Sequence, residues 1–152
     1  MVLPSLRTAA LALSLSALTS AAAIAAPSAS PTLKATLTGA AERPGPGDPK
    51  GSGTAVLRVD ASKDLVCYEL QVKNIGPISM AHIHQAPPED SGPPLAELTP
   101  PGPDGKSAGC VEAGPMMLEG LTSNPAAYYV NLHTKEHPAG ALRGQLAKAP
   151  GP

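Results

Sequence analysis

Three of the four histidines in this chain lie in two short segments in which apolar and polar residues alternate. In an extended strand the side chains of residues i and i+2 share a face, so His82 and His84 point to one side, and Ala81 and Ile83 to the other. His133 likewise takes the face opposite its apolar neighbours. If the two segments are neighbouring strands, the three imidazoles converge. Imidazole nitrogens bind copper and zinc well, so the pattern indicates a candidate copper or zinc site.

Other polar residues could support or extend this site. His137 follows in the expected hairpin loop and is either an additional ligand or plain surface. Asn131 shares a face with His133 and could hold an imidazole in place, or make a simple cross-strand hydrogen bond. Arg143, in the next expected strand, could attract an anion beside the histidines. Its alternative role is to support the fold through an ion pair, with these candidate partners: Glu42, Glu69 and Glu136.

The remaining sequence offers little else that could do chemistry. It has no G-x-S-x-G, no H-E-x-x-H and no phosphate-binding glycine loop. Glu89 and Asp90 are adjacent in a proline-rich loop and therefore face apart. There is no basic stripe, which argues against nucleic acid as a partner. The histidines could equally hydrogen-bond to neighbours on an exposed face, with no metal involved.

The first 25 residues have the pattern of a signal peptide. A short start ending at Arg7 carries positive charge, residues 9–18 are apolar, and Ala23 and Ala25 form a small-x-small cleavage signal. The first cysteine is Cys67, so no lipid-anchored cysteine follows the signal. No later stretch is long and apolar enough to span a membrane. We expect an exported protein, periplasmic or secreted, with a flexible tail over residues 26–32 and one domain over residues 33–148.

Cys67 and Cys110 are the two cysteines of the chain. In an oxidising compartment such a pair is usually bridged, and closing a loop of about forty residues would stabilise the fold by about 3–4 kcal/mol. The alternative is two separate buried thiols. A redox-active pair is disfavoured because there is no C-x-x-C spacing.

The rest of the chain predicts an all-β protein with one short helix. Turn-forming residues separate short segments of alternating polarity, which is typical of an antiparallel sandwich or barrel of seven or eight strands. The expected strands cover residues 33–39, 53–60, 65–73, 79–85, 95–98, 108–112, 126–134 and 141–147. The helix is expected over residues 115–124, with Pro115 at its first position.

Several segments together resemble the chordin-type (CHRD) domain, in particular a stand-alone exported member of the kind found in bacteria. The most specific is Asn-Leu-His-Thr, followed by a short loop and then Leu-Arg-Gly-Gln. The resemblance implies an immunoglobulin-like, Greek-key β-sandwich and implies little about activity. The segments that carry it are residues 36–42, 51–55, 81–84, 129–134 and 138–146.

The histidine pattern also resembles the copper ligands of copper–zinc superoxide dismutases, in which two histidines lie close together on one strand and others far downstream. Here the loop between His84 and His133 has no histidine, so the zinc site with its bridging imidazole has no counterpart. Our leading hypothesis is an exported CHRD protein that acts by binding an extracellular protein or a copper or zinc ion. The alternatives are a dismutase-like copper redox enzyme and a structural or adhesive module without a ligand.

Overall fold

A computed structural model describes residues 30–150 of the chain. The predicted signal peptide, residues 1–25, and the first part of the predicted tail lie outside the described residues. Within them, the first strand begins at Thr32, one residue before the expected start. None of the helices in this part of the chain is long and apolar enough to cross a membrane.

The described residues form nine β-strands, one α-helix and two short 3-10 helices. In the first half these are β1 (Thr32–Thr38), η1 (Gly39–Ala41), β2 (Ser52–Asp60), β3 (Leu65–Lys73), β4 (Ile78–Gln85) and β5 (Pro94–Leu98). In the second half they are β6 (Lys106–Glu112), α1 (Pro115–Ser123), η2 (Pro125–Ala127), β7 (Tyr128–Thr134), β8 (Leu142–Gln145) and β9 (Ala147–Lys148).

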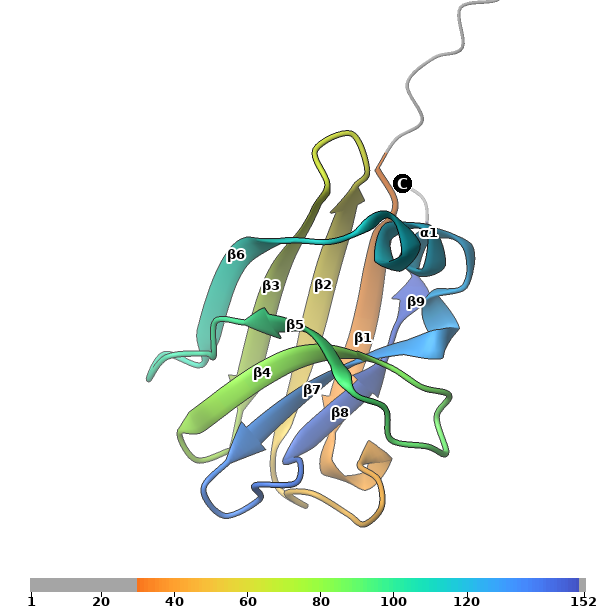
Figure 1. Cartoon of the computed structure of the whole chain (residues 1–152). Helices are drawn as coiled ribbons and strands as arrows, with labels where there is room; N and C mark the ends of the chain where they lie inside the picture. Colours follow the sequence, from red (N-terminus) through yellow and green to blue (C-terminus); the bar gives the residue numbers. More distant parts are fainter. Residues whose placement is uncertain (1–29, 151–152) are drawn as a thin grey trace, which may run out of the picture.

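The strands pair in the order β5-β4-β7-β8-β1-β2-β3-β6, with β9 beside β1, and the pairs are antiparallel. Figure 1 shows β4, β7 and β8 crossing in front of β1, β2 and β3. The two layers are joined at β8 and β1 by one residue pair, Thr38 with Arg143. At the other side β5 and β6 contact one another, which makes the sheet nearly closed and barrel-like. The expected all-β antiparallel class with one short helix is confirmed, while the immunoglobulin-like details stay a prediction.

The core lies between the two layers and follows directly from the alternating sequence. Leu33 and Leu37 of β1 and Leu57 of β2 are fully buried, and they face Ile83 of β4 and Leu132 of β7 in one apolar cluster. Because alternate side chains point to opposite faces, burying these residues forces the intervening ones onto the outer face. The core register therefore also fixes the face on which the histidines lie.

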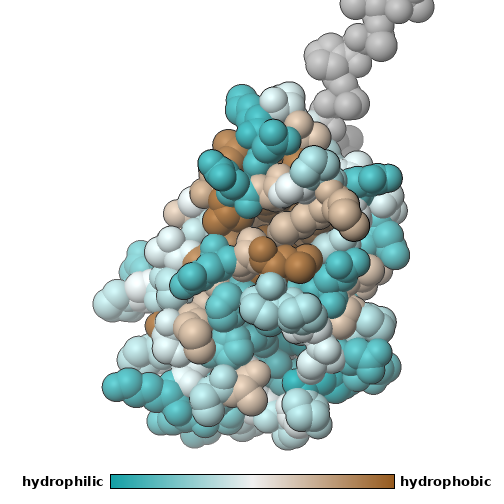
Figure 2. Space-filling model, viewed as in Figure 1, coloured by the Kyte–Doolittle hydropathy of each residue, from teal (hydrophilic) through white to brown (hydrophobic). Residues whose placement is uncertain are grey.

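Helix α1 covers one end of the sheet (Figure 1). It begins at Pro115, as predicted, because a proline at the first helical position loses no helical hydrogen bond. It ends at Ser123, one residue earlier than expected, and buries Leu118 and Leu121 against the core. Figure 2 shows a brown and tan area on this side of the molecule. Met116 of α1 and Leu95 of β5 are exposed apolar residues that line one hollow between the two elements.

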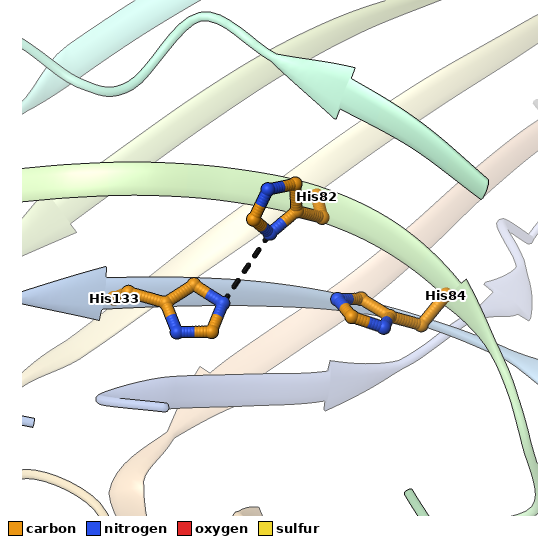
Figure 3. A group of neighbouring side chains, drawn as sticks. All are labelled: His82, His84 and His133. Carbon is orange, nitrogen blue, oxygen red and sulfur yellow. Dashed lines mark hydrogen bonds between the residues drawn. The ribbon is translucent and has the colours of Figure 1, made fainter. Parts of the chain in front are cut away.

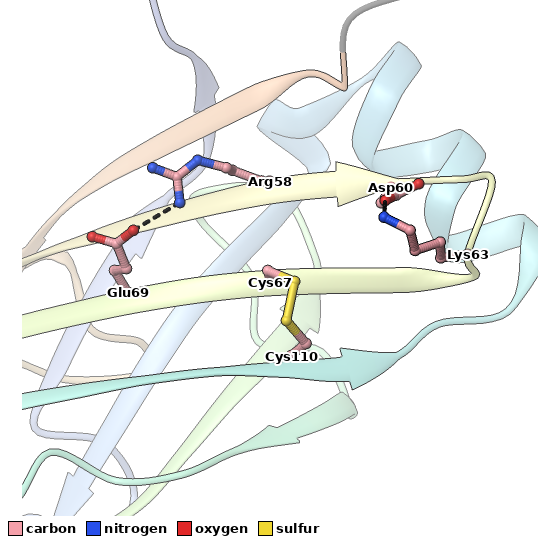
Figure 4. The surroundings of a disulfide bond; sticks show 6 residues. All are labelled: Arg58, Asp60, Lys63, Cys67, Glu69 and Cys110. Carbon is pink, nitrogen blue, oxygen red and sulfur yellow. Dashed lines mark hydrogen bonds and ion pairs between the residues drawn. A yellow bond between two sulfur atoms is a disulfide. The ribbon is translucent and has the colours of Figure 1, made fainter.

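A disulfide joins Cys67 to Cys110, as predicted. The two cysteines lie directly opposite each other on β3 and β6, on the outer face of the sheet (Figure 4). An ion pair between Arg58 and Glu69 lies on the same face. The disulfide thus ties β6, the last strand in the sheet order, to its neighbour β3 and closes a loop with a sequence separation of 43 residues.

Candidate metal centre

The three histidines come from two strands that are neighbours in the sheet, as predicted. His82 and His84 lie on β4, and His133 lies on β7. The β4–β7 register places His82 opposite Asn131 and puts His133 opposite Met80. Residues paired in this way point to the same side of an antiparallel sheet, so all three imidazoles share the outer face.

The imidazoles meet closely enough to share one ion. One nitrogen from each ring can be chosen so that the three lie within 4.8 Å of one another. His82 Nδ1 is 3.3 Å from His133 Nε2, and Figure 3 shows His84 approaching the same point from the other side. Nitrogens bound to one copper or zinc ion at about 2.0–2.1 Å lie within about 4 Å of each other. The spacing is therefore close to what a three-histidine site needs.

Two backbone carbonyls orient these rings. Nδ1 of His84 lies 2.8 Å from the Gly92 carbonyl oxygen, and Nδ1 of His133 lies 3.0 Å from that of Pro138. Since a carbonyl only accepts, each Nδ1 must carry the proton. In a neutral ring with the proton on Nδ1, the lone pair of Nε2 is free. This tautomer can bind a metal through Nε2. Nε2 of His84 is buried and has no hydrogen-bond partner among the described residues.

Burial keeps two of the rings in the neutral form that binds metals. It lowers the pKa of His84, although the hydrogen bond to Gly92 acts in the opposite direction. Burial and the neighbouring His133 likewise lower the pKa of His82, while Glu97 raises it. Removal from water disfavours the charged imidazolium. Protons therefore compete less strongly with a metal cation for the imidazole nitrogens.

The outer face around the histidines is covered by the loop of residues 86–93 between β4 and β5, which the sequence did not suggest. Arg143 on β8 holds this loop by donating to the carbonyls of Asp90 at 2.7 Å and Pro87 at 3.0 Å. Gln145 adds a bond of 2.7 Å to the carbonyl of Ala86. The arginine therefore serves the fold, which is the alternative role that the sequence offered, but it does so mainly through backbone carbonyls.

Tyr129 connects Arg143 to the histidine site. Its ring stacks on His84, with centroids 4.8 Å apart and planes inclined by 9°. The guanidinium carbon of Arg143 lies 3.6 Å from the centre of the same tyrosine ring. The tyrosine hydroxyl accepts a hydrogen bond of 3.2 Å from the backbone N–H of Gly92, whose carbonyl orients His84. Through these stacked contacts, Arg143 and Tyr129 hold the ring of His84 in position.

A buried carboxyl group, that of Glu42, lies on the same covered face. Asn131 donates a short hydrogen bond to it, and a second one of 3.4 Å to the Leu142 carbonyl. The amide of Asn131 is thus bonded to these two oxygens rather than to an imidazole. Gly140 has a positive φ of 151° and lies so close to Glu42 that a Cβ there would collide with the carboxyl group. Burial raises the pKa of Glu42 to about 7, although nearby Arg143 acts to lower it.

We expect Glu42→Gln to change how stability depends on pH. The pKa of Glu42 rises from 4.5 to about 7 on folding, so the folded state binds more protons between these values, and wild-type stability falls as pH rises through this window. That difference corresponds to about 3 kcal/mol. The variant should lack this decline. As pH rises from acidic to mildly alkaline, its free energy of unfolding should therefore increase by about 3 kcal/mol relative to that of wild type. Denaturant unfolding across this pH range measures it. Glu119→Gln, at an exposed helix position, is the control. If the free energy of unfolding of Glu42→Gln and of wild type changed with pH in parallel, the raised pKa of Glu42 would be contradicted.

The other predicted site residue, His137, is not in the cluster. It lies half-buried in the loop after β7, where its backbone N–H donates to the Thr134 side chain. The sequence reasoning missed the roles of Glu42, Tyr129 and Gly92. Loops bring Glu42 and Gly92 to the site, whereas Tyr129 lies on β7 as the cross-strand partner of His84, a pairing that depends on the strand register. Among residues 30–150, the three histidines are the one group of three or more His, Cys, Asp or Glu side chains that meets the spacing for a metal.

The family model of the CHRD domain matches residues 33–146. The chain belongs to the CHRD domain family. This match begins inside β1 and ends after β8, so it covers both histidine strands and the loop that orients them. No curated protein and no solved structure matches this CHRD chain.

Proposed function

We propose that this CHRD protein is an exported binding protein that takes up one copper or zinc ion through His82, His84 and His133. The observation that carries the proposal is the free Nε2 of His84. This nitrogen is buried and has no hydrogen-bond partner among the described residues. It belongs to a ring that is oriented through its Nδ1 by the carbonyl of Gly92. A buried polar atom without a partner is costly, and a bound cation would satisfy it.

The burial of the histidines also fits metal binding better than hydrogen bonding on a solvated sheet face. His84 and His133 are each 8% exposed, so they are not solvated residues of an open sheet face. His82 is half-buried and gives the cluster one side open to solvent. A site with buried donors and an open position could exchange its ion, or present it to a small molecule.

Metal titration tests the proposal. Calorimetry of the mature protein with Cu(II) and with Zn(II) should show one ion per chain. Affinity should fall with acidification only below about pH 6.5, because burial lowers the pKa of His82 and His84 from that ordinary value. Absence of binding for both ions would contradict the proposal and favour the structural or adhesive module. Two ions per chain, together with superoxide turnover by the loaded protein, would favour the dismutase-like alternative.

Export is part of the same proposal. It is supported by the signal-like residues 1–25 and by the disulfide between Cys67 and Cys110, a bond that persists in oxidising compartments. We place the protein in the periplasm or outside the cell. We also propose that the barrel-like sheet is a variant of the immunoglobulin-like sandwich, supported by its two facing layers (Figure 1).

A further inference from the structure

One residue beside the cluster brings a different kind of donor. Met80 precedes His82 by two positions on β4, so both side chains leave the strand on the same face. The β4–β7 register pairs Met80 with His133. Met80 is therefore the strand neighbour of one histidine of the cluster and the cross-strand neighbour of another.

The local backbone also sets Met80 apart. The register shifts between Ile78 and Met80, and the Ser79 side chain donates to the His133 carbonyl at 3.2 Å. Irregularities of this kind redirect a side chain and are frequent next to functional sites. Met80 is 40% exposed, and it belongs to the few large apolar residues on the surface. Core packing therefore does not account for a methionine here.

From these observations we propose that the Met80 thioether is the fourth donor of the site and makes it select copper, Cu(I) above all, over zinc. This inference rests on the proposed metal-binding function. Cβ atoms of a cross-strand pair are about 4.5–5.5 Å apart, and the three rotatable bonds of methionine allow its sulfur to cover that distance. A thioether is a soft ligand that favours Cu(I), whereas zinc accepts imidazole and carboxylate ligands readily.

The competing fourth donor is Glu97 on β5, which pairs with His82. It is exposed and adjoins only that one histidine, on the side of β4 away from His133. Its carboxylate is not in the group of atoms that come together. Met80 instead lies beside both His82 and His133, whose facing nitrogens are 3.3 Å apart. The strand register therefore favours the sulfur.

Comparison of Cu(I) with Zn(II) affinity tests the assignment. Met80→Leu keeps the size of the side chain and removes the sulfur. We expect its Cu(I) affinity, measured anaerobically by competition with a chromogenic chelator, to fall by about 10-fold or more, with Zn(II) affinity nearly unchanged. Met116→Leu, which removes a thioether that is 87% exposed on α1, should change neither affinity. X-ray absorption of the Cu(I)-loaded wild type should show a sulfur neighbour that is missing in Met80→Leu.

The outcomes separate this inference from the proposed function. If Met80→Leu binds Cu(I) as wild type does and shows the same absorption spectrum, the role of Met80 is wrong and the histidine site stands. If Glu97→Gln weakens binding and Met80→Leu does not, the fourth donor is the carboxylate and the inference is overturned. If wild type binds neither Cu(I) nor Zn(II), the proposed function fails and Met80 has no role to play.

Discussion

We expect His133→Ala to weaken the binding of Cu(II) and Zn(II) by about 100-fold or more, because removing a ligand should cost more than the 10–100-fold typical of losing a residue that only orients a ligand. His133 is central to the cluster: its Nε2 faces His82, and its Nδ1 is bonded to a backbone carbonyl. Without it, three donors become two. Calorimetric titration of wild type and variant at one pH measures the loss.

His137→Ala is the matched control. It removes the same side chain four residues further along, outside the cluster, and should change affinity little. His82→Ala provides a second ligand variant at a half-buried position, where truncation disturbs packing less than at His133. Both ligand variants should melt cooperatively, which separates lost binding from lost folding. Equal affinity of wild type and both folded ligand variants would exclude the histidine cluster as the binding site.

We expect Cys67→Ser to lower the free energy of unfolding by about 3–4 kcal/mol and the melting temperature by about 10–20 °C. The bond closes a loop with a sequence separation of 43 residues, so its loss gives the unfolded chain much additional freedom. The chain has three tyrosines and no Phe or Trp, so its core buries little area per residue. For a domain of typical stability, about 5–15 kcal/mol, the loss is large.

Thermal melts under non-reducing conditions measure this effect. Cys110→Ser should melt at the temperature of Cys67→Ser, and so should the wild type after full reduction, because all three lack the same cross-link. Both cysteines lie on the outer face, where a serine can be solvated, so cavity formation adds little. If both serine variants melted like the oxidised wild type, the bond would have no stabilising role.

Much of the fold could be predicted from the sequence, because alternation of polarity is a local signal. It placed the strands that became β2, β3 and β4 within a residue of their ends, and it put His82 and His84 on one face. Where the signal was interrupted, the prediction was less accurate. The expected closing strand over residues 141–147 is two strands, β8 and β9, and residues 126–127 belong to η2 instead of β7.

The covering of the outer face could not be predicted. Every residue of β7 is buried, including the polar Asn131 and His133, although alternation predicted an exposed polar face. Three segments far from β7 or beyond its end contact this face: the loop of residues 86–93 that Arg143 holds in place, Glu42 after η1, and the loop after β7, whose Pro138 carbonyl is bonded to His133. The first two contacts join residues far apart in the chain, and no local pattern encodes them.

The contact between Arg143 and Asp90 also makes the orientation of His84 depend on residues that are far apart in the chain. The two residues are separated by 53 positions in the chain, and the loop that this contact holds is the one that orients His84. Contacts between distant residues form late, because the intervening chain must first lose its freedom. An emerging or partly folded chain can therefore pair β2 with β3 while His84 is still unoriented. The histidine site is therefore complete only once β8 has joined the sheet, so the metal binding proposed above would require the finished fold and not only the strands that carry the histidines.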